Sequence, residues 1–297
     1  RYLVGDGDGT SDRLTPTEAA GLSSGVSEVV VGHNSACVLT ATGGVKCWGQ
    51  NHHGQVGDGT GTHRVVPVDV IGLSSGVTVL DVGYWRGCAV TDQGGVKCWG
   101  RGAGGSTPTD VNGLTSGVVD VAAGSDIGCA VTDQGAVKCW GHNSRGQLGD
   151  GTTTNSYDIP VDVVGLSSGV ASVEAGGYHV CAITSAGGGK CWGSNWIAQL
   201  GDGTREDQYT PVDLYGFSSG LAGVSLQGYH QCALSTDGYV KCWGYDSNGQ
   251  RGTGVRSFST TATHVRDAPE GFPAEVGVTV ADGSGSVTET IELTWGL

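Results

Sequence analysis

The sequence contains no methionine, only three phenylalanines and only seven prolines, whereas glycine accounts for 56 of its 297 residues. This composition argues against a helical or doubly wound protein and favours short strands joined by glycine turns. Hydrophobic residues make up 37% of the chain, which is enough for a core if such strands stack on one another. No apolar run approaches the ~20 residues that a membrane-spanning helix needs, so we expect no membrane insertion.

Basic residues are also scarce. Fifteen lysines and arginines are outnumbered by 29 acidic residues, which gives a formal net charge of -14. Nucleic-acid backbones and anionic membranes attract basic patches, so neither is expected as a partner. The five lysines form no patch selected for a polyanion, because all of them occupy one position of a repeated unit: Lys46, Lys97, Lys138, Lys190 and Lys241.

The chain has no unpaired cysteine, no C-x-x-C motif and no histidine at a zinc-finger offset from a cysteine pair, so no metal site is expected. The cysteines instead form five pairs ten positions apart: Cys37 and Cys47, Cys88 and Cys98, Cys129 and Cys139, Cys181 and Cys191, and Cys232 and Cys242. A complete set of equally spaced pairs indicates an oxidising compartment. No signal peptide is visible and the chain starts at Arg1, so we expect a mature segment of a larger extracellular or cell-surface protein.

Each cysteine pair brackets the same short unit. Residues 88–100 read C-A-V-T-D-Q-G-G-V-K-C-W-G, and the unit returns at 37–49, 129–141, 181–193 and 232–244. Two short β-type runs around a glycine turn predict a hairpin. With the turn centred midway, the two cysteines of each unit lie directly opposite each other. Cross-strand neighbours have Cβ atoms about 4.5–5.5 Å apart, so each hairpin is predicted to carry its own disulfide.

The units repeat with a period typical of propeller arrays. The first cysteines of successive units are 51, 41, 52 and 51 residues apart. Between hairpins a linker recurs; from Gln55 it reads Q-V-G-D-G-T, then a polar stretch, then P-V-D-V-I-G-L-S-S-G-V. The linker that follows Trp99 lacks the G-D-G-T loop. We expect this deletion to leave a gap on one rim of the array.

Both termini depart from the repeat. The amino terminus starts inside a unit, because residues 4–7 and 16–26 align with the linker. At the other end, one interpretation makes residues 276–295 a degenerate hairpin that closes the ring. The alternative makes residues 268–297 the start of a separate module similar to fibronectin type III. The propeller repeats are accordingly assigned to residues 1–267.

The motif C-A-V-T-x-x-G-x-V-K-C-W-G, followed by N-x-x-G-Q-L-G-D-G-T, resembles the repeat of the regulator-of-chromosome-condensation (RCC1-like) family in its cysteine-containing bacterial form. The resemblance covers roughly residues 1–265 and recurs five times. It implies an all-β propeller of four-stranded blades around a central channel, here with five disulfide-clipped hairpins and a degenerate sixth blade. It does not fix the function, because that family includes a nucleotide-exchange factor, a light sensor and inhibitors of secreted enzymes.

No repeated motif indicates catalysis. G-L-S-S-G at 21–25, 72–76 and 165–169 matches the nucleophile pattern G-x-S-x-G, but it recurs in the linkers without the strand-to-helix context that the pattern requires. We expect a turn that enters a strand. The G-D-G-T loops at Gly57, Gly149 and Gly201 supply one carboxylate each, too few for calcium unless the loops converge. We expect Asx-type turns there, with calcium as the alternative, and no other cofactor.

The informative positions are those that vary while the scaffold stays constant. Equivalent loops of a propeller meet on one face around the channel, and the loops before the first cysteines place aromatic, arginine and histidine residues there. Such residues are typical of binding hot spots. A second variable set follows each Trp-Gly. The candidate ligand-binding residues from both sets are Tyr84, Trp85, Arg86, Asp126, Tyr178, His179, Trp196, Tyr229 and His230.

These features predict a secreted or cell-surface binding module that recognises a protein or a glycan through one propeller face. Catalysis is not the expected function. Two alternatives stay open: a polysaccharide-degrading enzyme that uses tyrosines and histidines of that face, and an inhibitor of a secreted enzyme. The acidic charge and the cysteines argue against a chromatin-linked exchange factor.

Overall fold

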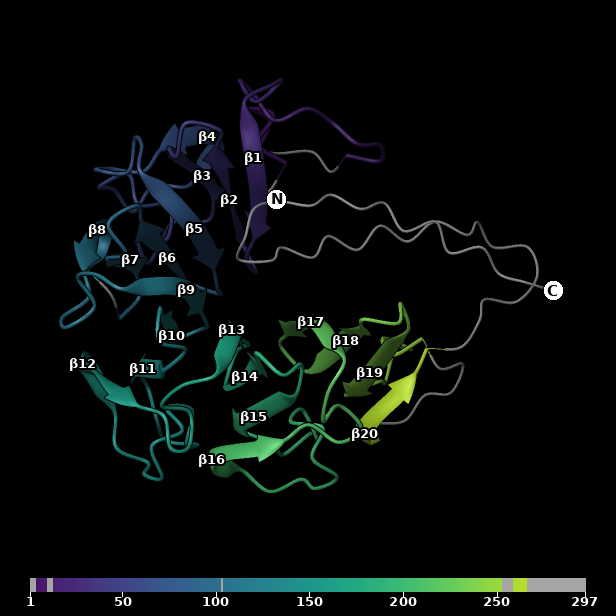
Figure 1. Cartoon of the computed structure of the whole chain (residues 1–297). Coiled ribbons are helices and arrows are strands. Elements are labelled where there is room, and N and C mark those ends of the chain that lie inside the picture. Colours follow the sequence, from purple (N-terminus) through teal and green to yellow (C-terminus); the bar gives the residue numbers. More distant parts are fainter. Residues whose placement is uncertain (1–3, 10–12, 103, 253–258, 266–297) are drawn as a thin grey trace.

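The structure is a computed structural model, and it describes residues 4–9, 13–102, 104–252 and 259–265. Within these residues it is all-β, with five four-stranded antiparallel sheets in which sequential strands are neighbours. Figure 1 shows the five sheets arranged around a common centre, as the blades of a propeller, with one strand of each nearest the centre. The predicted all-β propeller of four-stranded blades is confirmed. The described part of the chain holds no helix with the length and apolarity to span a bilayer.

Each blade runs from an inner strand to an outer strand. Blade 1 contains β1 (Val26–Val31), β2 (Ser35–Thr40), β3 (Val45–Gly49) and β4 (Arg64–Asp69). Blade 2 contains β5 (Val77–Val82), β6 (Arg86–Thr91), β7 (Val96–Gly100) and β8 (Gly105–Asp110). Blade 3 contains β9 (Val118–Ala123), β10 (Ile127–Thr132), β11 (Val137–Gly141) and β12 (Ser156–Asp162). Blade 4 contains β13 (Val170–Ala175), β14 (His179–Thr184), β15 (Gly189–Gly193) and β16 (Gln208–Asp213). Blade 5 contains β17 (Leu221–Gln227), β18 (His230–Ser235), β19 (Val240–Gly244) and β20 (Ser259–His264).

The second and third strands of every blade form the predicted hairpin. In blade 1 the register places Cys37 opposite Cys47, and the other four pairs follow the same pattern. The paired sulfur atoms are 2.01–2.14 Å apart, and no cysteine of the chain is free. The prediction of one disulfide within each blade is therefore confirmed.

In blades 2 to 5 the tryptophan after the second cysteine fills the space between its own blade and the preceding one. Trp99 of blade 2 is fully buried and packs in one cluster with Val70 and Leu73, which follow the outer strand of blade 1. Its indole N–H donates to the carbonyl oxygen of Gln55 at 2.9 Å. Equivalent clusters join blades 2 and 3, blades 3 and 4, and blades 4 and 5. Because no blade could bury both of its faces alone, these interfaces make up the core of the molecule.

A glycine of the preceding linker lies against the indole in blades 2, 4 and 5. A Cβ on Gly149 would lie 2.8 Å from Nε1 of Trp192, and the residue has a φ of +67°, so only glycine fits there. Gly5 lies in the same way against Trp48 of blade 1. Residues 4–9 therefore take the place of a preceding linker, as their alignment with it predicts.

The face of blade 1 that is turned away from blade 2 is only partly covered. Val29 and Val31 are 63% and 57% exposed, whereas Leu80 and Val82, at the same positions of β5, are 3% and 5% exposed. The difference arises because blade 1 packs a preceding blade's linker but no preceding inner strand among the described residues. The predicted sixth blade, and the alternative fibronectin-like module, fall on residues 276–295 and 268–297, which lie outside the described residues.

Candidate functional site

The two sets of variable loops lie at the same end of the propeller. In each blade, the residue after Trp-Gly donates its backbone N–H to the residue three positions before the first cysteine. Arg101 bonds in this way to the carbonyl of Trp85 at 2.9 Å, and His142 bonds to that of Asp126 at 3.0 Å. The same bond occurs in the other three blades. The loops before the cysteines and the loops after Trp-Gly therefore form one surface, which we call the loop face.

One aromatic group on the loop face joins blades 1 and 2. The ring of His33 stacks on Tyr84 with centroids 3.8 Å apart, and Tyr84 meets Trp85 edge-on at 5.2 Å. His53 approaches the other side of Trp85 at 5.5 Å. The guanidinium of Arg101 lies 4.5 Å from the centre of the Trp85 ring, a cation–π contact. These contacts fix the rings in place before any ligand arrives.

A second aromatic group lies on blades 4 and 5. Trp196 meets Tyr229 at 6.0 Å, and Tyr229 meets Tyr245 at 6.4 Å. Trp196 and Tyr229 are 51% and 49% exposed, and Tyr178 nearby is 42% exposed. Partial burial raises the pKa of Tyr84, and the nearby Tyr229 and Tyr178 raise it further. The two aromatic groups therefore lie on one surface, close enough for Tyr178 and Tyr229 to affect Tyr84, and His33 and Tyr84 line the mouth of the channel.

The charged side chains of the loop face are largely paired with each other. Arg101 binds Asp126 at 3.0 Å, and Arg145 binds Asp207 at 2.9 Å. The ion pairs span neighbouring blades, since Arg101 belongs to blade 2 and Asp126 to blade 3. The loop face thus presents aromatic surface framed by internal ion pairs rather than a patch of one charge.

Arg86 and His179 lie beneath the loop face rather than on it. Both side chains are fully buried. Arg86 donates to the carbonyl oxygens of Arg101 and Gly102 at 3.2 and 2.8 Å, and burial lowers its pKa to about 10. It fills space beside the shortened linker between β7 and β8. His179 has no hydrogen-bond partner for either ring nitrogen among the described residues, and burial lowers its pKa to about 4. His230 is half-buried at the equivalent position.

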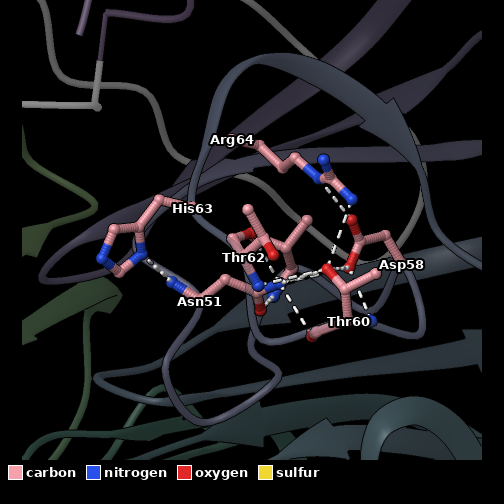
Figure 2. Close-up of polar contacts among 7 residues, drawn as sticks. Asn51, Asp58, Thr60, Thr62, His63 and Arg64 are labelled. Carbon is pink, nitrogen blue, oxygen red and sulfur yellow. Dashed lines mark hydrogen bonds and ion pairs between the residues drawn. The ribbon is translucent and has the colours of Figure 1, made fainter.

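The loops that follow Trp-Gly are locked by a buried asparagine. Figure 2 shows Asn51 at the centre of one such loop, where its side-chain amide donates to Asp58 at 3.1 Å and to the carbonyl of Thr60 at 2.9 Å. Its own side-chain oxygen accepts from the backbone of Val56 at 2.9 Å. Asn143 and Asn195 repeat this arrangement in blades 3 and 4. The lock explains how flexible-looking loops present Trp196 in a defined place.

The carboxylate of the G-D-G-T loop is engaged in the same network. Asp58 accepts hydrogen bonds from the backbone and hydroxyl of Thr60 at 3.0 and 2.8 Å, the geometry of an Asx-type turn, and from Arg64 at 2.5 Å. Burial alone would raise the pKa of Asp58, but these hydrogen bonds lower it below its usual value. No group of three or more histidine, cysteine or acidic side chains suited to a metal ion occurs in the described ranges.

The channel below the mouth is lined by the inner strands and is acidic. It forms a cavity of about 1230 Å³ with Glu28, Asp81, Asp120 and Glu174 in its wall. Burial raises the pKa of Asp81 to about 7 and that of Asp120 to about 6. The side chain of Glu174 still contacts water, yet its confinement between strands and the nearby Asp81 and Asp120 raise its pKa well above the usual value. These carboxylates were not singled out from the sequence, although Glu28 and Asp120 share one position of the inner strand and Asp81 and Glu174 share another.

Sequence reasoning also missed several residues of the loop face. His142, Arg101 and Tyr245 all occupy the position directly after Trp-Gly, where the repeats differ most in chemistry. That variability was the available signal. Of the residues that were named, Tyr84, Trp85, Asp126, Tyr178, Trp196 and Tyr229 have side chains that reach the loop face. Their role in ligand binding stays a prediction.

The fold and the loop face define a propeller that presents loops from all five described blades on one surface. Two family profiles, both for the regulator of chromosome condensation (RCC1) repeat, match the chain: one at residues 134–183, the other at 26–55, 118–147 and 228–250. The chain is therefore an RCC1-repeat β-propeller, as the resemblance implied. Its cysteine-containing bacterial form stays a prediction.

Curated relatives and solved structures agree with this assignment. The chain is 29% identical over 260 residues to the ultraviolet-B receptor UVR8 of Arabidopsis thaliana, covering 82% of the chain and 59% of the receptor. It is 32% identical over 247 residues to the human E3 ubiquitin-protein ligase HERC2, covering 81% of the chain but 4% of the ligase. The chain thus spans only part of these relatives.

Among solved structures, human WBSCR16 superposes with a TM-score of 0.68 at 24% identity, covering 82% of the chain and 67% of that structure. Prp20p of Saccharomyces cerevisiae superposes with a TM-score of 0.68 at 21% identity, covering 82% of the chain and 65% of that structure. At these identities the two likenesses show the fold.

Proposed function

We propose that this propeller is an extracellular or cell-surface binding module that recognises a partner protein through the loop face. The observation that carries the proposal is the pair of aromatic groups around the channel mouth, which leaves Tyr178, Trp196 and Tyr229 about half exposed. Aromatic side chains that are partly exposed yet held rigid lose little entropy on binding and dominate interface energetics. The ion pairs beside these aromatic side chains help to orient the partner, and they create no strong net electrostatic field.

The disulfides support the proposed location. All ten cysteines are paired within blades, and such sets persist in oxidising compartments. Structural relatives support a protein partner: Prp20p is described with its binding properties to Gsp1p and histones, and yeast RCC1 (Prp20) is described with Kap60 bound. Those partners belong to those proteins. What carries over to this chain is the use of the scaffold for protein recognition.

The enzyme alternative lacks a competent histidine pair. A polysaccharide-degrading site on this face would rely on His179 and His230, but His179 is fully buried and its pKa is lowered to about 4. A general acid or base has to reach its substrate within hydrogen-bond distance. Inhibition of a secreted enzyme remains compatible with the proposal, since it is one form of protein binding.

The test is affinity capture with the whole immobilised chain, followed by calorimetry with the purified partner. Trp85→Ala and Trp196→Ala should each weaken binding about tenfold or more, as expected for central aromatic residues. Tyr215→Ala is the matched control, because Tyr215 is 65% exposed but follows the outer strand β16. Binding that survives both tryptophan substitutions would contradict the proposal. If the chain instead binds a glycan on an array and the same variants lose that binding, the ligand is a glycan and not a protein.

A further inference from the structure

A small hollow opens on the loop face between blades 3 and 4. Its volume is about 190 Å³, and it is lined by His142, Ser144, Arg145, Tyr178, Ser194 and Trp196. Tyr178 and Trp196 give it aromatic walls that are 42% and 51% exposed. The remaining four residues are polar, and none of the six carries a carboxylate. The hollow is therefore rich in hydrogen-bond donors in a protein that is acidic as a whole.

A glutamine beneath the hollow fixes the orientation of His142. The side-chain oxygen of Gln147 accepts the backbone N–H of Arg145 at 2.7 Å, which determines which end of this amide is oxygen. The amide nitrogen of Gln147 then lies 3.1 Å from Nδ1 of His142. Because that nitrogen is a donor, Nδ1 has to accept, and the neutral ring carries its proton on Nε2. His142 is thus held as an Nε2–H donor.

The contact between this glutamine and a histidine is specific to blade 3 among the blades compared. The glutamine itself recurs, since Gln55 and Gln199 accept backbone N–H groups at 3.0 and 3.1 Å in the same way. The position of His142 is occupied by Gln50 in blade 1 and by Ser194 in blade 4. The repeated scaffold therefore fixes the orientation of the glutamine in all three blades. Among these, only blade 3 has a histidine whose ring orientation the glutamine can fix.

Arg145 supplies further donors at the rim of the hollow. One of its terminal nitrogens binds Asp207 at 2.9 Å, and its side chain is 55% exposed. A guanidinium has five N–H groups in a planar fork, so this single contact leaves donors for a second oxygen ligand. Asp207 also accepts the backbone N–H of Asn195 at 2.7 Å, which holds the ion pair in position.

We propose that this hollow binds the carboxylate of a glutamate or aspartate side chain of the partner protein. The methylene groups of that side chain would lie between Tyr178 and Trp196, and its oxygens would accept from His142 Nε2–H and Arg145. The proposal rests on the proposed function and names the chemistry that one part of the loop face recognises. A carboxylate fits better than a cation, because every polar side chain that lines the hollow can donate and none of the lining residues is acidic.

The first test uses two small probes on the whole chain: N-acetyl-glutamate methylamide and its glutamine counterpart. The glutamate probe should shift the NMR signals of the His142 ring and the Trp196 indole at millimolar concentration, and the glutamine probe should not. In the His142→Phe variant, which keeps an aromatic ring but removes the donor, the shift at Trp196 should weaken about tenfold in apparent affinity. Equal responses to both probes, or none to either, overturn the proposal.

The second test selects peptides from a displayed random library on the wild-type chain. Peptides that bind the loop face should share an acidic position whose change from glutamate to glutamine costs about tenfold in affinity, and His142→Phe should remove that preference. His52→Phe, an exposed histidine of blade 1, is the control and should leave it intact. Peptides that need Trp85 but show no acidic position overturn this proposal while the proposed function stands. If the loop face selects no peptide and captures no partner, the proposed function fails instead.

Discussion

The carboxylate of Asp81, on the inner strand of blade 2, accepts a hydrogen bond of 2.6 Å from the backbone N–H of Ala123 on the inner strand of blade 3. Asp120 repeats the contact one blade further, accepting from the N–H of Val173 at 2.9 Å. Among the described strands, none pairs with an inner strand on its channel side, so the N–H groups there need another acceptor. Asp81 and Asp120 therefore join neighbouring blades at their inner edges.

We expect the protein to lose stability as the pH rises from 6.5 to 8. The pKa of Asp81 is about 7 in the folded state, against a usual 3.8, so the folded chain holds a proton that the unfolded chain has already released. The free energy of unfolding then falls as the pH rises through this window. Asp120, with a pKa of about 6, acts in the same direction at lower pH. Thermal unfolding should show a melting temperature a few degrees lower at pH 8 than at pH 6.5.

The Asp81→Asn variant is the control for this pH dependence. Its amide oxygen can still accept the Ala123 N–H, but it carries no charge at any pH. The melting temperature of the variant should change less between pH 6.5 and 8 than that of the wild type. An unchanged slope would assign the pH dependence to other groups.

His179 should affect stability with the opposite sign and at lower pH. Its pKa is lowered to about 4 from 6.5, so between these values the folded chain binds fewer protons than the unfolded chain. Stability from this group therefore rises as the pH rises from 4 to 6.5. His179→Ile should be neutral or stabilising by about 1 kcal/mol, because the substitution removes the unpaired ring nitrogens. An isoleucine fits there, since Ile127 occupies the same position of blade 3. Denaturant titrations at pH 5 and 7 measure the effect, and a loss above about 2 kcal/mol would contradict it.

The burial of Arg86 and His179 shows where sequence reasoning stopped short. Both were treated as loop residues, yet β6 begins at Arg86 and β14 begins at His179. Residues two apart on a strand share a face, so Arg86 points the same way as the buried Cys88. Extending the hairpin register two pairs beyond the cysteines would have predicted this from the sequence. Trp85, one position earlier, correctly falls outside the strand.

The hairpins were predictable because their information is local. A turn position and a period of two determine that Cys37 faces Cys47. The contacts between blades were less accessible. Asp81 meets Ala123 across 42 positions, and the acidic residues alternate between two positions of the inner strand from one blade to the next. The orientation of His142 depends on Gln147 and Arg145 together, so it required the coordinates of all three residues.

Removing the asparagine at the centre of a loop should destabilise the protein without unfolding it. Asn51→Ala deletes the contacts to Asp58, Thr60 and Val56 and leaves buried backbone groups unpaired. A loss of about 2–3 kcal/mol in unfolding free energy is expected. Because Asp58 is already satisfied by Thr60 and Arg64, excess calcium should not raise the melting temperature of the wild type. A calcium-dependent increase, abolished by Asp58→Asn, would contradict this account of the loop.

The five disulfides should differ in their resistance to reduction. Cys232 of blade 5 is half-buried, whereas Cys129 and Cys139 of blade 3 are fully buried between two blades. Thiol–disulfide exchange requires access of the attacking thiolate to a sulfur atom. Limited reduction in native buffer, followed by alkylation and mass spectrometry, should therefore label Cys232 and Cys242 first.

The cost of removing each disulfide shows whether the bond that is easiest to reduce also contributes least to stability. Replacing Cys232 and Cys242 together by alanine should cost about 2–3 kcal/mol, the value that the chain-entropy model gives for so short a loop. The Cys129→Ala and Cys139→Ala double variant removes a disulfide that closes a loop of the same length, and it also leaves a cavity at an interface between blades. Its loss of unfolding free energy should therefore be larger. Equal losses, or labelling of Cys129 as early as Cys232, would mean that packing between blades does not protect these bonds.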